Sequence, residues 1–236
     1  MTAISPCESL KQVTELYTYL ESTDFLDNIP AMGIGLRAAH FIPRGTLIFQ
    51  ERPVILIPTG GASEDRDGLI KDAVNAVPIQ ELQRFRQLQT AFRFKDYEPD
   101  LGRFHTNAMK CEVENGSDFA GLFFLGSRFN SSCIPNVHQH WDGTSMKFYA
   151  MTNIPHLEEL CICYETRDLT LSQAQRQRRI QHTRGFYCQC AACLHPALES
   201  DARRERIGRA LAIRNRDDHA FVMLNVSVHS TQDEIS

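Results

Sequence analysis

Three cysteines within six residues form the pattern with the clearest chemistry in this sequence: Cys188-Gln-Cys190-Ala-Ala-Cys193. Thiolates are preferred zinc ligands, and structural Zn²⁺ takes four ligands at tetrahedral positions, with sulfur about 2.3 Å away. The spacing therefore predicts a zinc site to which this segment contributes three ligands. The fourth must come from elsewhere in the chain, and the candidates are Cys133, Cys111, His195 and His182.

Two other segments concentrate hydrogen-bonding side chains. They are residues 128–136, Arg-Phe-Asn-Ser-Ser-Cys-Ile-Pro-Asn, and residues 154–164, Ile-Pro-His-Leu-Glu-Glu-Leu-Cys-Ile-Cys-Tyr. Asparagines in such segments often satisfy backbone groups in turns, and this is the interpretation favoured for Asn136. Glu158 and Glu159 could form an acid–base pair, but structural hydrogen bonding is favoured.

Two pairs of side chains alternate along the predicted strands, so each pair shares one face. His138 and His140 could bind a metal, but packing or surface exposure is favoured. Cys161 and Cys163 are expected to be buried apolar side chains.

Strands and turns must position these groups. Phe41–Pro58 is expected to be extended, with a turn at Pro43-Arg-Gly45. A second turn is expected at Asp142-Gly143. Short strands are predicted at Val137–Trp141, Met146–Met151 and Leu160–Tyr164.

Helices are predicted on both sides of these strands and as an insertion among them. Residues 8–26 have helical apolar spacing, and residues 59–103 are interpreted as a helical insertion. Ser172–Arg184 forms a further helix, with a capping box at Ser172 and Gln175 and a C-terminal Gly185. Its basic run, Arg176, Arg178 and Arg179, indicates a solvated face. The fold class is therefore mainly β with helical insertions (α+β).

Composition excludes some classes of function. The 236 residues carry a formal net charge of −4, whereas binding to a nucleic-acid backbone usually needs a positive excess. No apolar run reaches the roughly 20 residues that span a bilayer, and no signal-peptide pattern is present. We therefore expect an intracellular protein, cytoplasmic or nuclear, with reduced cysteines and no membrane or direct nucleic-acid partner.

Four motifs in a fixed order resemble the SET family of lysine methyltransferases. Residues 128–136 resemble the signature R-x-x-N-H-S-C-x-P-N, and residues 154–164 resemble G-E-E-L-x-x-x-Y. Gly33-Ile-Gly35 looks like the N-terminal G-x-G motif, and the three-cysteine segment looks like the post-SET cysteines. The insertion and the cysteine spacing are most similar to the SET-and-MYND branch and its fungal relatives, although no MYND finger is present.

The resemblance implies a domain organisation and a fold. A SET-type β-clip fold is implied, with a pseudoknot between the two longer motifs. The expected parts are an N-terminal helix (1–30), a SET domain (31–166) with its insert (59–103), a helix with the zinc knuckle (167–196), and a C-terminal helical stub and tail (197–236).

The resemblance also implies a cofactor and its contacts. S-adenosylmethionine (SAM) would lie along the main chain of Ile34, Gly35, Leu36 and Arg37. Asn130 would bind its amino-acid end, Ser131 would lie beside the adenine, and Asn107 would be another cofactor contact. Phe186 would stack on the adenine, and Tyr164 would be the catalytic tyrosine beside the cofactor. Cys133 would complete a structural zinc site with Cys188, Cys190 and Cys193.

The implied activity is SAM-dependent methylation of a lysine in a protein or peptide, with histones among the candidate substrates. Three positions depart from the family pattern: Ser131 replaces a histidine, Leu157 a glycine, and Arg184 an aromatic residue of the substrate channel. Two alternatives therefore stay open. One is a catalytically silent SET-fold binding or scaffold protein, and the other is a SAM-pocket enzyme acting on a small molecule.

Overall fold

A computed structural model describes residues 26–29, 33–60, 63–113, 118–165, 169–195 and 199–212. Most of the expected N-terminal helix and the end of the C-terminal tail lie outside these residues. Residues 26–29 are described and form a strand, so the expectation that the helical part extends to residue 30 was wrong there. The chain forms two compact units: residues 1–164 with 184–186, and residues 165–183 with 187–236. No described helix is long and apolar enough to cross a membrane.

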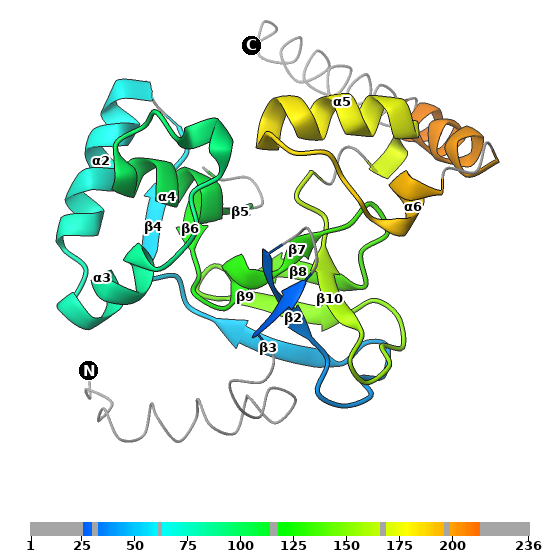
Figure 1. Cartoon of the computed structure of the whole chain (residues 1–236), viewed down its shortest axis with the longest axis horizontal. Coiled ribbons are helices and arrows are strands. Elements are labelled where there is room, and N and C mark those ends of the chain that lie inside the picture. Colours follow the sequence, from blue (N-terminus) through cyan, green and yellow to red (C-terminus); the bar gives the residue numbers. More distant parts are fainter. Residues whose placement is uncertain are drawn as a thin grey trace, which may run out of the picture. The chain divides into compact units, whose positions relative to one another are not determined.

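The first unit contains three small sheets. Their strand orders are β1-β2-β10-β7, β3-β9-β8 and β4-β6-β5 (Figure 1). The strands are β1 (Leu26–Ile29), β2 (Gly33–Arg37), β3 (Leu47–Glu51), β4 (Ile55–Pro58), β5 (Met109–Cys111), β6 (Phe119–Leu122), β7 (Asn130–Ser131), β8 (Val137–Trp141), β9 (Met146–Ala150) and β10 (Glu159–Ile162).

The sheet order brings distant motifs together. β10 pairs with β2 on one side and, in parallel, with β7 on the other, so the segments around residues 34, 130 and 160 are neighbours. β8 and β9 form an antiparallel hairpin, whereas β3 pairs with the distant β9. Gly143 has φ +97° between β8 and β9, and Gly45 has φ +86° before β3, which confirms the two predicted turns.

Aromatic side chains fill the core between these sheets. Phe49 of β3 and Phe148 of β9 are fully buried with ring centroids 4.5 Å apart. Phe129 lies 4.7 Å from Phe148 and stacks on Phe49 at 5.7 Å. The backbone immediately before β7 is thereby anchored by a side chain that is closely packed on both β3 and β9.

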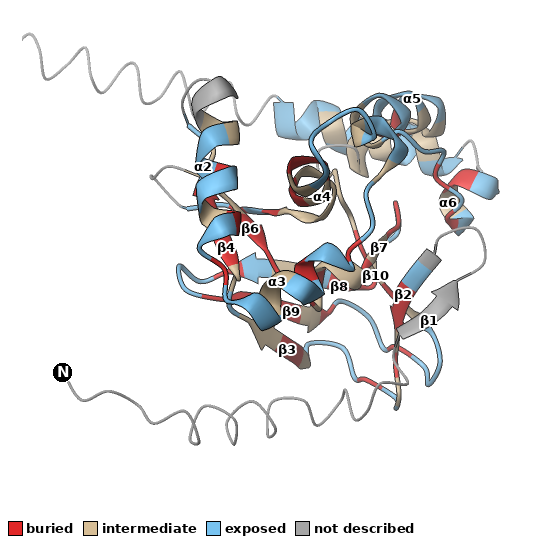
Figure 2. Cartoon of the chain, turned by 60° about the vertical axis from the view of Figure 1, so that its left-hand side comes forward, coloured by how far each residue is buried: buried red, intermediate tan, exposed pale blue. Residues whose placement is uncertain are grey.

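The predicted insertion is helical and has its own core. It consists of α2 (Ser63–Asn75), α3 (Ile79–Arg86), a 3₁₀ turn η2 (Phe92–Phe94) and α4 (Pro99–Asn107). α2 packs on β4 and α4. Buried residues of this insertion, among them Ile70, Phe85 and Phe104, form a hydrophobic cluster of their own. In Figure 2 the helices of the insertion carry exposed and buried stretches side by side. The helices continue four residues beyond the expected boundary at 103. β5, which the sequence analysis did not predict, follows directly.

The second unit contains α5 (Gln173–Arg184), α6 (Ala191–Leu194) and a helical segment at 199–212. The Ser172 N–H donates to the Gln175 side-chain oxygen at 3.0 Å, and Gly185 has φ +78°. Both observations support the predicted helix ends.

The prediction that Arg176 lies on a solvated face was wrong. Its side chain is 1% exposed, and its guanidinium donates to the Leu171 carbonyl at 2.6 Å. It also lies 3.4 Å from the Asp201 carboxylate. Burial of this cation is compatible with stability because it is paired and hydrogen-bonded. Arg178 and Arg179 are exposed, as expected.

Candidate functional site

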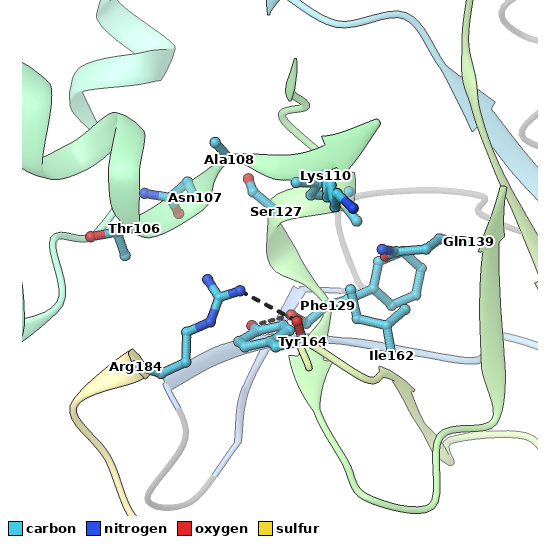
Figure 3. Close-up of a pocket in the computed structure, with 12 residues that line it drawn as sticks. Thr106, Asn107, Ala108, Lys110, Ser127, Phe129, Gln139, Ile162, Tyr164 and Arg184 are labelled. Atoms are coloured by element: carbon cyan, nitrogen blue, oxygen red, sulfur yellow. Dashed lines mark hydrogen bonds between the residues drawn. The ribbon is translucent and has the colours of Figure 1, made fainter. Parts of the chain in front are cut away.

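A small pocket lies beside Tyr164 at the end of β10 (Figure 3). Its volume is about 70 Å³, which is room for a few water molecules or for the end of a side chain. The Tyr164 hydroxyl donates to the Phe129 carbonyl oxygen at 2.6 Å. The described lining residues are Thr106, Asn107, Ala108, Met109, Lys110, Gly126, Ser127, Phe129, Gln139, Ile162, Tyr164 and Arg184.

The Tyr164 hydroxyl keeps its proton at neutral pH. Burial raises the pKa of Tyr164 to about 12, and the nearby positive charge of Arg184 opposes this rise. A protonated phenol can donate one hydrogen bond and still accept another. Because Phe129 takes the donated bond, the oxygen can accept a hydrogen bond from a group that enters the pocket.

Parallel pairing of β7 with β10 positions this tyrosine. Asn130 is opposite Cys161 and Ser131 is opposite Ile162. The buried Ser131 hydroxyl oxygen accepts the Tyr164 N–H at 3.3 Å. The serine that stands in place of the family's histidine therefore makes a side-chain contact with the candidate catalytic residue.

Two asparagines link the segments further. The Asn130 amide donates to the Glu159 carboxylate at 2.8 Å. The Asn136 amide donates to the Glu159 carbonyl at 2.8 Å, and its oxygen accepts the Cys161 N–H at 2.8 Å. Asn136 also reaches Glu158 at 3.3 Å. These contacts support the structural roles favoured for Asn136 and for the two glutamates.

Glu51, at the end of β3, binds the part of the pocket lining that contains Gly126 and Ser127. Its carboxylate accepts the N–H groups of Leu125 at 3.1 Å and Gly126 at 2.8 Å, at the start of the 3₁₀ turn η3 (Gly126–Arg128). Burial raises the pKa of Glu51, while these N–H groups and Arg84 lower it. Gly126 has no room for a side chain, since a Cβ there would lie 2.9 Å from the Phe148 ring.

β2 carries the four residues predicted to lie along a cofactor. Leu36 is fully buried, Ile34 is 45% exposed, and Arg37 donates to the Leu157 carbonyl at 2.9 Å. Leu157 has φ +66°, a conformation that favours glycine. The turn before the two glutamates thus has a backbone conformation that the family's glycine would adopt without strain.

Of the predicted cofactor contacts, Tyr164 and Asn107 line the pocket. The Asn107 amide donates to the carbonyls of Gln89 at 2.8 Å and Arg103 at 2.7 Å, which fixes the side chain at the end of α4. Phe186 is 38% exposed, and neither it nor Asn130 is among the lining residues.

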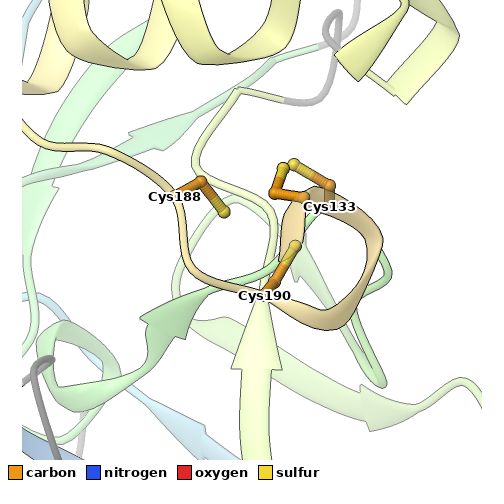
Figure 4. Close-up of side chains that lie close together, drawn as sticks. Cys133, Cys188 and Cys190 are labelled. Atoms are coloured by element: carbon orange, nitrogen blue, oxygen red, sulfur yellow. The ribbon is translucent and has the colours of Figure 1, made fainter. Parts of the chain in front are cut away.

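The cysteine prediction is supported by the positions of the thiols. Sulfur atoms of Cys133, Cys188, Cys190 and Cys193 all lie within 4.8 Å of one another, and all four residues are buried (Figure 4). Ligands 2.3 Å from one ion at tetrahedral angles lie roughly 3.8 Å apart. The four thiols therefore fit Zn²⁺ in both number and spacing. Among the other fourth-ligand candidates, Cys111 lies in β5.

The sequence model of the SET domain matches residues 33–165. The chain belongs to the SET-domain family. The match includes β2, the insertion, and the two motif segments 128–136 and 154–164, the second of which ends at Tyr164. It confirms the SET fold class and the mixed α+β architecture.

Curated relatives include fungal, plant and animal SET proteins. The histone-lysine N-methyltransferase set5 of Schizosaccharomyces pombe is 34% identical over 185 residues, covering 76% of this chain and 54% of that protein. Histone-lysine N-methyltransferase ASHR1 of Arabidopsis thaliana is 34% identical over 126 residues, 52% of this chain and 26% of its own length. The protein-lysine N-trimethyltransferase SMYD5 of Gallus gallus is 32% identical over 122 residues, covering 49% of this chain and 27% of that protein. The chain thus spans about half of the first relative and about a quarter of the others.

Several residues of this SET domain site escaped the sequence analysis. Glu51 ends an apolar strand, and nothing in its local sequence indicates that it accepts N–H groups more than 70 residues away. Gln139 lines the pocket, and its side-chain oxygen is buried with no hydrogen-bond partner among the described residues. Cys161 and Cys163 are only partly buried, less than expected, while His138 and His140 are exposed.

Proposed function

We propose that this chain is a SAM-dependent protein-lysine N-methyltransferase. The observation that carries the proposal is the Tyr164 pocket, in which two SET motifs bring a protonated phenol against the Phe129 carbonyl. The three relatives reported above are named as lysine methyltransferases, and these names support the same reaction. Proteins are therefore the proposed substrates, with histones as the first class to test.

The residues that would hold the cofactor fit its chemistry. SAM supplies a methyl group activated by a sulfonium charge. The Tyr164 hydroxyl and the Phe129 carbonyl put two oxygens at the pocket, and oxygens interact favourably with an electron-poor methyl group. Main-chain groups of Ile34–Arg37 and the side chains of Asn107, Asn130, Ser131 and Phe186 would bind the rest of the molecule.

Tyr164 would orient the acceptor rather than deprotonate it. Its raised pKa leaves no phenolate to act as a base near neutral pH. The hydroxyl oxygen can instead accept an N–H from the lysine amine and point its lone pair toward the methyl group. Orientation of this kind, with fixed dipoles around the reacting atoms, provides the rate acceleration.

The four thiols would hold a structural zinc ion. Four protein ligands leave no open position for water or substrate, so the metal would supply folding energy rather than a nucleophile. Reduced thiols of this kind fit a cytoplasmic or nuclear protein.

Calorimetric titration of the zinc-loaded protein with SAM tests the cofactor site. We expect saturable binding that is weakened at least tenfold in Asn130→Ala. Asn153→Ala should leave it unchanged, because Asn153 is exposed and accepts a hydrogen bond from the exposed Arg44 N–H. No binding to folded, zinc-containing protein would favour the scaffold alternative.

Transfer of labelled methyl groups to recombinant core histones tests the reaction. Tyr164→Phe should keep SAM binding but lose at least about a hundredfold in rate, because the orienting oxygen is gone. Equal rates in Tyr164→Phe and the unmodified protein would refute the role of Tyr164.

A further inference from the structure

Gln139 is a polar residue at an inward-facing position of β8. It shares a face of the strand with Val137 and Trp141, which are 2% and 9% exposed, whereas the two residues between them are exposed. Such a position ordinarily takes an apolar residue. On the neighbouring strand β9, the residue opposite Gln139 is the fully buried Phe148. The amide of Gln139 is therefore held beside the apolar core.

The side-chain oxygen of Gln139 is buried and has no hydrogen-bond partner among the described residues. A buried acceptor without a partner is costly and exceptional in folded proteins. Gln139 lines the Tyr164 pocket, and Figure 3 shows its amide end directed toward the other labelled lining residues. The last torsion of a glutamine side chain is broad, so the oxygen can turn into the pocket at little cost.

Other polar side chains of the pocket have their donors bonded elsewhere. The hydroxyls of Thr106 and Ser127 donate to backbone carbonyls at 2.7 and 3.3 Å. The Asn107 amide donates to two backbone carbonyls, and the Lys110 ammonium is paired with two carboxylates. The Tyr164 hydroxyl donates to a carbonyl as well. A group that enters the pocket from outside can supply the donor that the Gln139 oxygen needs.

We propose that Gln139 binds the acceptor amine of the substrate, with its side-chain oxygen accepting one N–H. The inference rests on the proposed methyltransferase function and deepens it, because it specifies how many hydrogens the amine carries. The Tyr164 oxygen accepts the other N–H in the orientation described above. A neutral primary amine has two N–H groups and one lone pair, so it satisfies both oxygens while the lone pair faces the methyl group. Gln139 is thus a specificity-determining residue for a primary amine.

This arrangement favours the first methyl transfer over a second one. The nitrogen lone pair forms the new N–C bond, and the electron pair of the C–S bond that breaks stays on sulfur, which becomes a neutral thioether. The nitrogen is then an ammonium with two hydrogens, one of which passes to solvent as a proton. The monomethylated amine keeps a single N–H, so it leaves one of the two oxygens without a donor. A buried acceptor left unpaired should slow the second transfer roughly tenfold.

The ratio of kcat/KM for two peptides measures this preference. The peptides share one histone sequence and carry either lysine or monomethyl-lysine at the same position, and the methyl donor is labelled SAM. For the zinc-loaded protein we expect the lysine peptide to be preferred roughly tenfold. Gln139→Leu should remove most of this preference, whereas Gln139→Glu retains an oxygen acceptor and should keep it. His140→Ala, which changes the exposed next residue of β8, is the matched control and should leave the ratio unchanged.

Unfolding in urea gives a second readout that does not depend on activity. Gln139→Leu replaces an unpaired buried amide with an apolar side chain of similar size, so its urea midpoint should equal or exceed that of the unmodified protein. A clearly lower midpoint would show that the amide is bonded within the fold and would overturn the inference.

An unchanged peptide ratio in active Gln139→Leu would also overturn the role of Gln139, and it would leave the proposed function standing. Absence of methyl transfer to both peptides and to core histones by the unmodified, SAM-binding protein would overturn the proposed function and this inference with it.

Discussion

Asn136 should be one of the most destabilising polar positions to truncate. Its side chain is 9% exposed and joins two segments more than 20 residues apart through the Glu159 carbonyl and the Cys161 N–H. Asn136→Ala leaves both backbone groups buried without these partners, at about 1–3 kcal/mol each. The Glu158 carboxylate is exposed and regains water, so its bond adds little. We expect a loss of about 3 kcal/mol, or a fall in Tm of roughly 6–12 °C for a chain of this size.

Urea unfolding of the zinc-loaded protein, followed by tryptophan fluorescence, measures this loss. Trp141 is the only tryptophan in the sequence, and it is buried in the core cluster of the unit that contains Asn136. Asn153→Ala is the matched control and should cost no more than about 1 kcal/mol, because the Arg44 N–H that it releases is exposed. If the two variants unfold at the same urea concentration, the amide bonds of Asn136 do not hold the two segments together.

Three other outcomes follow from single contacts. The pKa of Glu51 is raised above its ordinary value of 4.5, so the folded state binds this proton more tightly than the unfolded chain. The unfolding free energy should therefore fall as pH rises from 4.5 through the folded pKa, and urea midpoints for Glu51→Gln should lack this fall; an equal slope in both proteins would contradict the assignment. Leu157→Val should cost about 1–2 kcal/mol in thermal unfolding, since a β-branched residue tolerates φ +66° poorly, whereas Leu157→Gly should be nearly neutral; equal losses would argue against strain. Cys111 is fully buried and its pKa is raised to about 12, so a thiol reagent should label it only in urea; rapid labelling of the native protein, located by peptide mass spectrometry, would disprove its burial.

The parts of the fold predicted from sequence are those with local signals. Ser172, Gln175 and Gly185 mark the ends of α5 because capping and left-handed turns depend on a few adjacent residues. β5 was not predicted because three residues are too few to show a strand period, and its pairing with β6 decides its structure. That the two longer motifs lie together was expected only from the family resemblance, and the strand order was not predicted.

The sequence analysis missed the burial of Arg176 and the role of Glu51, because both depend on residues that are distant in the sequence. Arg176 lies in a basic run, which alone favours solvent, but Asp201 and the Leu171 carbonyl make its burial favourable. Glu51 receives its N–H donors from a turn more than 70 residues away. Asp201 is 25 residues from Arg176 in the sequence, and the donors to Glu51 are more distant still. Residue type alone therefore predicts the usual exposure of an arginine or a glutamate and not its burial in this protein.

The three departures from the family pattern differ in their physical consequences. Ser131 retains a contact to Tyr164 through its hydroxyl, and Leu157 takes the backbone conformation of a glycine despite the strain. These two substitutions leave the strand pairing and the turn in place. Arg184 instead changes the charge of the pocket wall. The departures therefore favour the silent alternative less than their number suggests, because two of the three leave the structure around Tyr164 in place.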